Sequence, residues 1–241
     1  MHPGWLSNSW LVVDEPTRRA IVIDTGGPFE PLRTIIEGES LELSHVLCTH
    51  HHHDHVHHNA DYRERFGCAV CGHAAERELF PGGLDTLLAD GDELVTGGLH
   101  VRALHIPGHT RGQLGFVIND EAVFTGDTLF RGSVGGTRAP GHTTFEDLRT
   151  SIVDVLMELP DETRIFPGHM DPTTVARERA ENPFVLAWSG SRDVAGTRCT
   201  AFGEPAELLL RASDYDGGTK CWVRFEDGRM DVVPGSRVSR A

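Results

Sequence analysis

A run of histidines interrupted by one acid is the most reactive feature of this 241-residue sequence. Seven of its fifteen histidines fall between His50 and His58, and Asp54 lies among them. His50 and His52 are two residues apart, so both side chains can point to the same side of an extended segment. Asp54 and His55 follow at once and can serve a neighbouring position. Imidazole beside carboxylate suits Zn²⁺ or Fe²⁺, so this order predicts a metal site rather than a solvated histidine tract.

Three more residues that can bind a metal each follow a predicted strand on a tight turn. His109 follows an apolar segment over 101–106, Asp127 follows one over 122–124, and His169 follows one over 165–166. A sheet gives rigid placement, and the loops at its strand ends supply side chains to a site. Together with the histidine run, these three turns indicate a specific metal site.

Short apolar runs between turn-forming residues predict alternating strands and helices up to about residue 190. Thr144 and Asp147 are typical of a helix start, and Pro160 ends that helix. A last helix is predicted to end before Pro183. The remaining elements are strands at 10–13, 20–23, 45–48, 69–71, 99–106, 114–118, 122–124 and 165–166, and helices near 32–36 and 61–66.

Charge and pattern both change near residue 190. Residues 191–241 hold eight basic and eight acidic residues, whereas 1–190 hold the other 14 basic and 28 acidic residues, so the whole net charge of −14 lies there. A strand at 206–212 and a hairpin of 221–226 and 229–233, with a two-residue turn at Asp227 and Gly228, are predicted in the tail. We therefore expect a catalytic domain at 1–190 and a small all-β appendage at 191–241, after a linker near 189–196.

Several classes of protein are disfavoured by composition. No apolar run approaches the ~20 residues of a membrane helix, and the first residues lack the basic-then-apolar order of a signal peptide. We therefore expect a cytoplasmic protein without a membrane partner. The excess of acids argues against nucleic acid as a partner, because phosphate binding needs clustered Lys and Arg. The sequence indicates no particular oligomeric state.

Four motifs closely resemble those of the metallo-β-lactamase superfamily: THHHHDH at 49–55, PGHTRGQLGF at 107–116, FTGDTLFRGSVGG at 124–136 and PGH at 167–169. The resemblance covers about residues 5–188. Within the superfamily, GDTLF and TTVARERAENPF are most similar to the glyoxalase II-like hydrolases. The resemblance implies an α/β (α+β) fold, the four-layer αβ/βα sandwich, with a two-metal site at the edge of its sheets. The β appendage differs from the helical C-terminal region of true glyoxalase II.

The resemblance also implies the ligands of two divalent ions, zinc foremost, with iron or manganese as alternatives. The ligands of the first metal would be His50, His52 and His109. The ligands of the second would be Asp54, His55 and His169. The carboxylate of Asp127 would bridge the two. The pattern gives no ligand role to His51, His53, His57 or His58, and we expect these four to be exposed.

The implied activity is that of a zinc-dependent hydrolase. A hydroxide shared by two metals would attack a carbonyl, with Asp54 orienting it and taking its proton, and the expected substrate is a small acyl molecule, foremost a thioester. The sequence lacks the G-x-S-x-G elbow of serine hydrolases. Alternatives of the same fold are a mononuclear-iron persulfide dioxygenase, a lactone hydrolase and a nuclease; a scaffold acting through its β appendage is a further one.

Two smaller questions stay open in the sequence. Asp24, after an early strand, either supports a metal ligand, as the resemblance implies, or simply forms a turn. The loop over 130–142 contains Arg131, Arg138 and His142, which would either bind a substrate carboxylate or face solvent.

Overall fold

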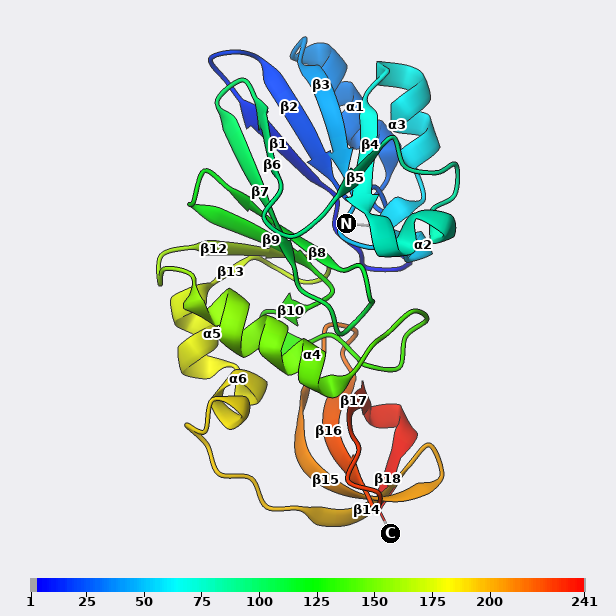
Figure 1. The fold of residues 1–241 in the computed structure, drawn as a ribbon, viewed down its shortest axis with the longest axis vertical. Helices are drawn as coiled ribbons and strands as arrows, with labels where there is room; N and C mark the ends of the chain where they lie inside the picture. Colours follow the sequence, from blue (N-terminus) through cyan, green and yellow to red (C-terminus); the bar gives the residue numbers. More distant parts are fainter. Residues whose placement is uncertain (1–3, 241) are drawn as a thin grey trace.

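The computed structural model describes residues 4–240 and arranges the first three quarters of the chain in four layers (Figure 1). Two β-sheets pack face to face, and helices cover their outer faces. This is the predicted αβ/βα sandwich. A third, separate sheet lies beyond the helices of the second layer pair.

The first sheet has the strand order β1-β2-β3-β4-β5, with only β1 antiparallel to its neighbour. Its strands are β1 (Trp10–Asp14), β2 (Arg19–Ile23), β3 (Glu42–Leu47), β4 (Ala69–His73) and β5 (Thr86–Leu88). The helices beside it are α1 (Phe29–Gly38), the short α2 (His53–Val56) and α3 (Asn59–Phe66), and a 3₁₀ turn, η1 (Ala74–Leu79), follows β4.

The second sheet has the order β13-β12-β9-β8-β7-β6. Its strands are β6 (Glu93–Thr96), β7 (Leu99–His105), β8 (Leu114–Ile118), β9 (Ala122–Gly126), β12 (Arg164–Pro167) and β13 (Thr173–Thr174). A small ribbon, β10 (Leu129–Phe130) and β11 (Ser133–Val134), follows β9. The outer helices are α4 (Phe145–Thr150), which continues through a π turn (Ser151–Val155) and a 3₁₀ turn (Leu156–Glu158), α5 (Val175–Glu181) and α6 (Pro183–Trp188).

The strands of the first sheet contribute alternate side chains to two different hydrophobic cores, one on each face of the sheet. In β2, Ala20 and Val22 pack under the helices of the first sheet, whereas Ile21 and Ile23 point between the sheets. Successive side chains of a strand point to opposite faces, so a continuous apolar run fits a strand that is covered on both sides.

The C-terminal strands form an antiparallel sheet in the order β17-β16-β15-β14-β18. They are β14 (Thr197–Ala201), β15 (Glu204–Ser213), β16 (Thr219–Phe225), β17 (Met230–Pro234) and β18 (Val238–Arg240), with a 3₁₀ turn, η4 (Gly235–Arg237), before the last strand. This sheet shares a core with the body, because Leu210 and Val232 belong to the same buried cluster as Phe184 and Trp188. Whether 1–190 and 191–241 fold as separate units remains a prediction.

One local prediction was incomplete and one was wrong, and each has a physical reason. The helix predicted to end before Pro183 is α5, which ends at Glu181, but it is not the last helix. Pro183 is the first residue of α6, a position that needs no N–H donor, and the Asn182 side chain caps that helix. The hairpin between β16 and β17 has a three-residue loop rather than a two-residue turn, because the amide of Phe225 bonds to the carbonyl of Arg229 and Gly228 is left-handed. The predicted capping of α4 by Thr144 and Asp147 is confirmed.

Within residues 4–240, no helix is long and apolar enough to cross a membrane.

We expect Phe145→Ala to destabilise body and tail together. The Phe145 ring stacks on Trp222 of the tail at 5.5 Å and meets Trp188 of the body edge-on at 5.3 Å. Loss of a buried aromatic ring costs about 3–5 kcal/mol. Urea unfolding should show one transition at a lower midpoint, whereas Ile35→Ala, at an exposed position on α1, should barely move it. Equal midpoints for the two variants would contradict this packing.

Candidate metal centre

The ligand candidates lie where strands of both sheets end. The histidine run follows β3, His109 follows β7, Asp127 directly follows β9, and His169 follows β12. β12 is parallel to β9, and β7 runs in the same direction because β8 is antiparallel to both β7 and β9. The ends of these strands therefore meet at one edge, and all seven predicted residues come together there.

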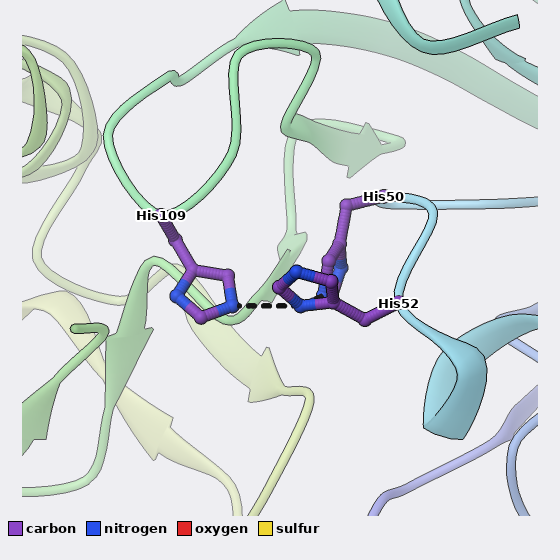
Figure 2. Close-up of side chains that lie close together, drawn as sticks. All are labelled: His50, His52 and His109. Atoms are coloured by element: carbon purple, nitrogen blue, oxygen red, sulfur yellow. Dashed lines mark hydrogen bonds between the residues drawn. The ribbon is translucent and has the colours of Figure 1, made fainter. Parts of the chain in front are cut away.

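Three histidines form the first donor group (Figure 2). Nε2 of His50 lies 2.9 Å from Nδ1 of His52, and Nε2 of His109 lies 3.1 Å from the same Nδ1. His52 has an extended backbone, with φ −60° and ψ 140°, which lets it point to the same side as His50. This agrees with the two-residue spacing in the sequence.

A second donor group surrounds the carboxylate of Asp127. Its Oδ1 lies 3.3 Å from Nε2 of His55, and its Oδ2 lies 3.3 Å from Nε2 of His169 and 3.6 Å from Nε2 of His109. Oδ2 of Asp54 lies 3.6 Å from Nε2 of both His55 and His169. Asp127 thus stands between the two groups, as a bridging carboxylate would.

These donors fit two divalent cations. Ligands about 2.1 Å from a tetrahedral ion lie about 3.4 Å from each other, close to the spacings observed. Nε2 of His55 and Oδ1 of Asp127 are buried 3.3 Å apart, and neither forms a hydrogen bond of good geometry with another residue in the described part of the chain. Buried polar atoms are usually paired, so this spacing of two free donor atoms fits a cation held by both.

The outward nitrogen of every ligand histidine is bonded to an acceptor, which fixes the ring and leaves the other nitrogen for a metal. His55 donates to Asp24 at 2.9 Å, and His50 meets the Thr49 hydroxyl at 3.0 Å. The other three outward nitrogens face backbone carbonyls, in the pairs His109–Gly136 (3.0 Å), His169–Leu6 (3.0 Å) and His52–Pro140 (2.8 Å).

Asp24 supports the site and is more than a turn residue. Its Oδ1 accepts the backbone N–H of Thr49 at 2.8 Å, and its Oδ2 accepts the Thr49 hydroxyl at 2.8 Å as well as His55 Nδ1. Asp24 is 2% exposed and has a φ of 55°, a conformation that Asp and Asn tolerate better than most residues. The carboxylate of Asp24 thereby holds both Thr49, which precedes the histidine run, and His55 within it.

Burial and charge set the protonation of the rings. Burial lowers the pKa of His50 and His52, and lowers that of His109 to about 3, so these rings are neutral and able to bind a metal at pH 7. Burial also opposes a charge on His55, but the carboxylates of Asp127 and Asp24 outweigh it and raise the pKa of His55 well above its usual value. The carboxylates around His55 thus favour a positive charge at this point of the site.

Glycine at position 168 is required by the close approach of its loop to the ligands. A Cβ at Gly168 would lie 2.3 Å from Oδ1 of Asp127 and 2.8 Å from Cε1 of His55. Any side chain there would displace a ligand, which explains a glycine before His169.

The other histidines of the run are outside the donor groups. His51 is partly buried rather than exposed as expected, with Nδ1 2.9 Å from Oε2 of the buried Glu76. Nδ1 of the half-buried His58 lies 2.6 Å from Oδ2 of Asp61, and His53 and His57 are exposed and meet the Trp5 ring edge-on.

The three basic side chains of the loop over 130–142 have different partners. Arg131 lies 3.4 Å from Asp171, and His142 bonds to the carbonyl of Thr143. Arg138 lies 2.7 Å from Asp231 of β17 and lines a cavity of about 290 Å³ that His109 also borders. Of the three candidates, Arg138 is the one beside the ligands.

The four-layer sandwich with His and Asp clustered at its sheet edge is typical of a class of metal-dependent hydrolases. The comparisons with known proteins agree with this class. Residues 2–169 match the family described as the metallo-beta-lactamase superfamily. The chain is 35% identical over 198 residues to hydroxyacylglutathione hydrolase GloC of Haemophilus influenzae, covering 74% of this chain and 92% of that protein.

Two solved structures are similar as well. ETHE1 from Myxococcus xanthus superposes with a TM-score of 0.66 at 32% identity, covering 75% of this chain and 80% of that one. TTHA1623, solved in a di-iron-bound form, gives 0.65 at 32% identity, covering 76% and 98%. The chain belongs to the metallo-beta-lactamase superfamily, whose members use divalent metals.

Some supports of the site were missed in the sequence. Leu6, Gly136 and Pro140 act through backbone carbonyls, which leave no trace in the residue type. Glu76 was missed because nothing in its local sequence distinguishes it from a solvated acid. The resemblance to known hydrolases was the one signal that pointed to Asp24.

We expect Asp24→Asn to weaken metal binding by about 10- to 100-fold, because it removes the charge that holds His55 and Thr49 while keeping the shape and tolerating the positive φ. Competition with a chromophoric chelator measures the affinity. Asp61→Asn, which alters a similar Asp–His contact outside the donor groups, is the matched control. Equal affinities in the two variants would show that Asp24 is only a turn residue.

Proposed function

We propose that this metallo-hydrolase holds two divalent ions and cleaves a thioester in a small acyl substrate. The observation that carries the proposal is the pair of donor groups joined at Asp127, with His50, His52 and His109 on one side and the second group on the other. We propose zinc as the metal, with iron or manganese as alternatives; the di-iron form of TTHA1623 supports the iron alternative.

Two divalent ions held by these residues would lower the pKa of a shared water toward neutrality and polarise a substrate carbonyl. Asp54 is the residue we assign to the proton. Its side chain is 30% exposed, whereas that of Asp127 is 8% exposed, so Asp54 is the carboxylate that a water or substrate can reach. With Oδ2 near His55 and His169, it is placed to orient the attacking water and accept its proton.

Ser133, in the Gly132–Gly135 segment that lacks the serine-hydrolase elbow motif, is not placed as a nucleophile, because it is buried and donates its hydroxyl to Asp214 at 3.0 Å. The thioester assignment is supported by the name of GloC, a hydroxyacylglutathione hydrolase. We further propose a cytoplasmic enzyme that acts on small molecules and not on nucleic acid, because the net charge of −14 repels polyanions.

A second candidate function follows from the similarity to ETHE1. We propose persulfide oxidation at a single iron as the alternative, and the two candidates differ in metal count and in oxygen demand. Metal quantification together with a screen of thioesters, lactones and β-lactams tests the hydrolase. One iron per chain, with oxygen uptake on a persulfide substrate and no hydrolysis, would favour the alternative.

We expect Asp127→Ala and His109→Ala to reduce hydrolysis to background and to lower the bound metal. Asp127→Ala removes the carboxylate that stands between the two donor groups, and His109→Ala removes one of the three histidines of the first group. Steady-state assays and elemental analysis measure the two effects. His58→Ala, in the same histidine run but outside both groups, is the control. Full activity in an Asp127→Ala protein stripped of metal would end the hydrolase proposal.

A further inference from the structure

The C-terminal sheet reaches the candidate metal centre through one aromatic ring. Tyr215 lies in the turn between β15 and β16, and its ring stacks on that of His169, with centroids 4.1 Å apart and planes 11° from parallel. The family match ends at residue 169, so this contact comes from a segment outside the matched region.

The stack is part of an enclosure around one imidazole. The edge of Phe130 meets His169 at 5.7 Å and meets Tyr215 at 5.3 Å. On its outward side, Nδ1 of His169 bonds to the carbonyl of Leu6. The parallel face of Tyr215 adds to this hydrogen bond, because a stacked ring resists rotation of the imidazole out of its plane.

A buried ion pair fixes the turn that presents Tyr215. Nζ of Lys220 lies 2.9 Å from Oδ2 of Asp214, and the two side chains are 8% and 6% exposed. Oδ1 of Asp214 accepts the hydroxyl of Ser133 on β11, at 3.0 Å, which ties the turn to the body. The only lysine of the chain is thus used at this junction, with its Nζ 5.7 Å from the Tyr215 ring centroid.

We propose that Tyr215 is a positioning residue, which holds the imidazole of His169 in the plane required to bind the second divalent ion. The C-terminal sheet is then a working part of the centre, attached by the Ser133–Asp214–Lys220 chain of contacts. This inference rests on the metal site of the proposed function and not on the identity of the substrate.

The test measures metal affinity in full-length variants. Zn²⁺ is titrated into metal-free protein against a chromophoric chelator, and Co²⁺ is used to record the visible spectrum of the bound ions. Tyr215→Ala should weaken the second ion by about tenfold or more and leave the first unchanged, because the first group has no contact with Tyr215. Tyr215→Phe keeps the stack and should bind both ions as the wild type does.

Two further variants separate stacking from packing. Tyr215→Leu keeps apolar bulk without a flat face and should lose second-ion affinity as Tyr215→Ala does; it also serves if the alanine variant fails to fold. Arg224→Ala removes an exposed side chain of the same sheet, one that forms an ion pair with Glu207, and should bind both ions normally.

Two kinds of result would contradict different parts of the proposal. Wild-type affinity for the second ion in both Tyr215→Ala and Tyr215→Leu, or an equal loss in Tyr215→Phe, would overturn the role of the stack. A wild-type protein that binds no second ion would overturn the binuclear proposal itself, so the two failures are distinguishable.

Discussion

The structure depends on one electrostatic constraint, the confinement of carboxylates and imidazoles at a buried sheet edge. Asp24 and Asp127 are 2% and 6% exposed, and an ionised carboxylate in such a place costs several kcal/mol unless a positive charge balances it. Against the opposing effect of burial, the same carboxylates raise the pKa of His55 well above its usual value, so they favour a positive charge at this point. Two divalent ions would balance these charges and, with every histidine neutral, raise the net charge of the chain from −14 to about −10. The confined carboxylates are therefore what makes cation binding favourable.

The need to hold these imidazole rings in place explains why the hydrogen-bond partners of the ligand histidines come from widely separated parts of the chain. Strands from both sheets bring the donors to one edge, but a strand end fixes a ring less well than a bonded nitrogen does. The outward partners come from Leu6 near the beginning, Asp24 after β2, and the loop carbonyls of Gly136 and Pro140. Because these segments meet only in the folded state, metal binding and folding of the layers stabilise each other.

The same physics explains what could be predicted from the sequence. The seven residues that meet at the sheet edge were identifiable because a divalent metal restricts the residue types and a sheet restricts where they occur. Apolar runs such as 20–23, which are buried on two sides, located individual strands, whereas the four-layer arrangement and the division of the ligands between two metals came from the resemblance to a known superfamily. The edge strands β5 and β6 went unpredicted because Leu87 and Val95 are exposed and no apolar run marks them. The helix that begins at Pro183 went unpredicted because it has only six residues. The Asp227–Gly228 pair fits both a two-residue turn and a three-residue loop, and the pairing of the flanking strands selected the loop.

The tail limits how far the relatives can inform the chemistry of this chain. The region that matches the family, 2–169, contains all seven predicted donor residues. The surroundings of the donors include residues beyond this region, because Tyr215 covers one face of His169 and Lys220 and Arg237 line the cavity beside His109. A substrate whose carbonyl lies at the donors would meet these side chains with the rest of its structure. If the proposed hydrolysis is correct, the choice of substrate would therefore depend in part on residues 191–241, which lie outside the family match.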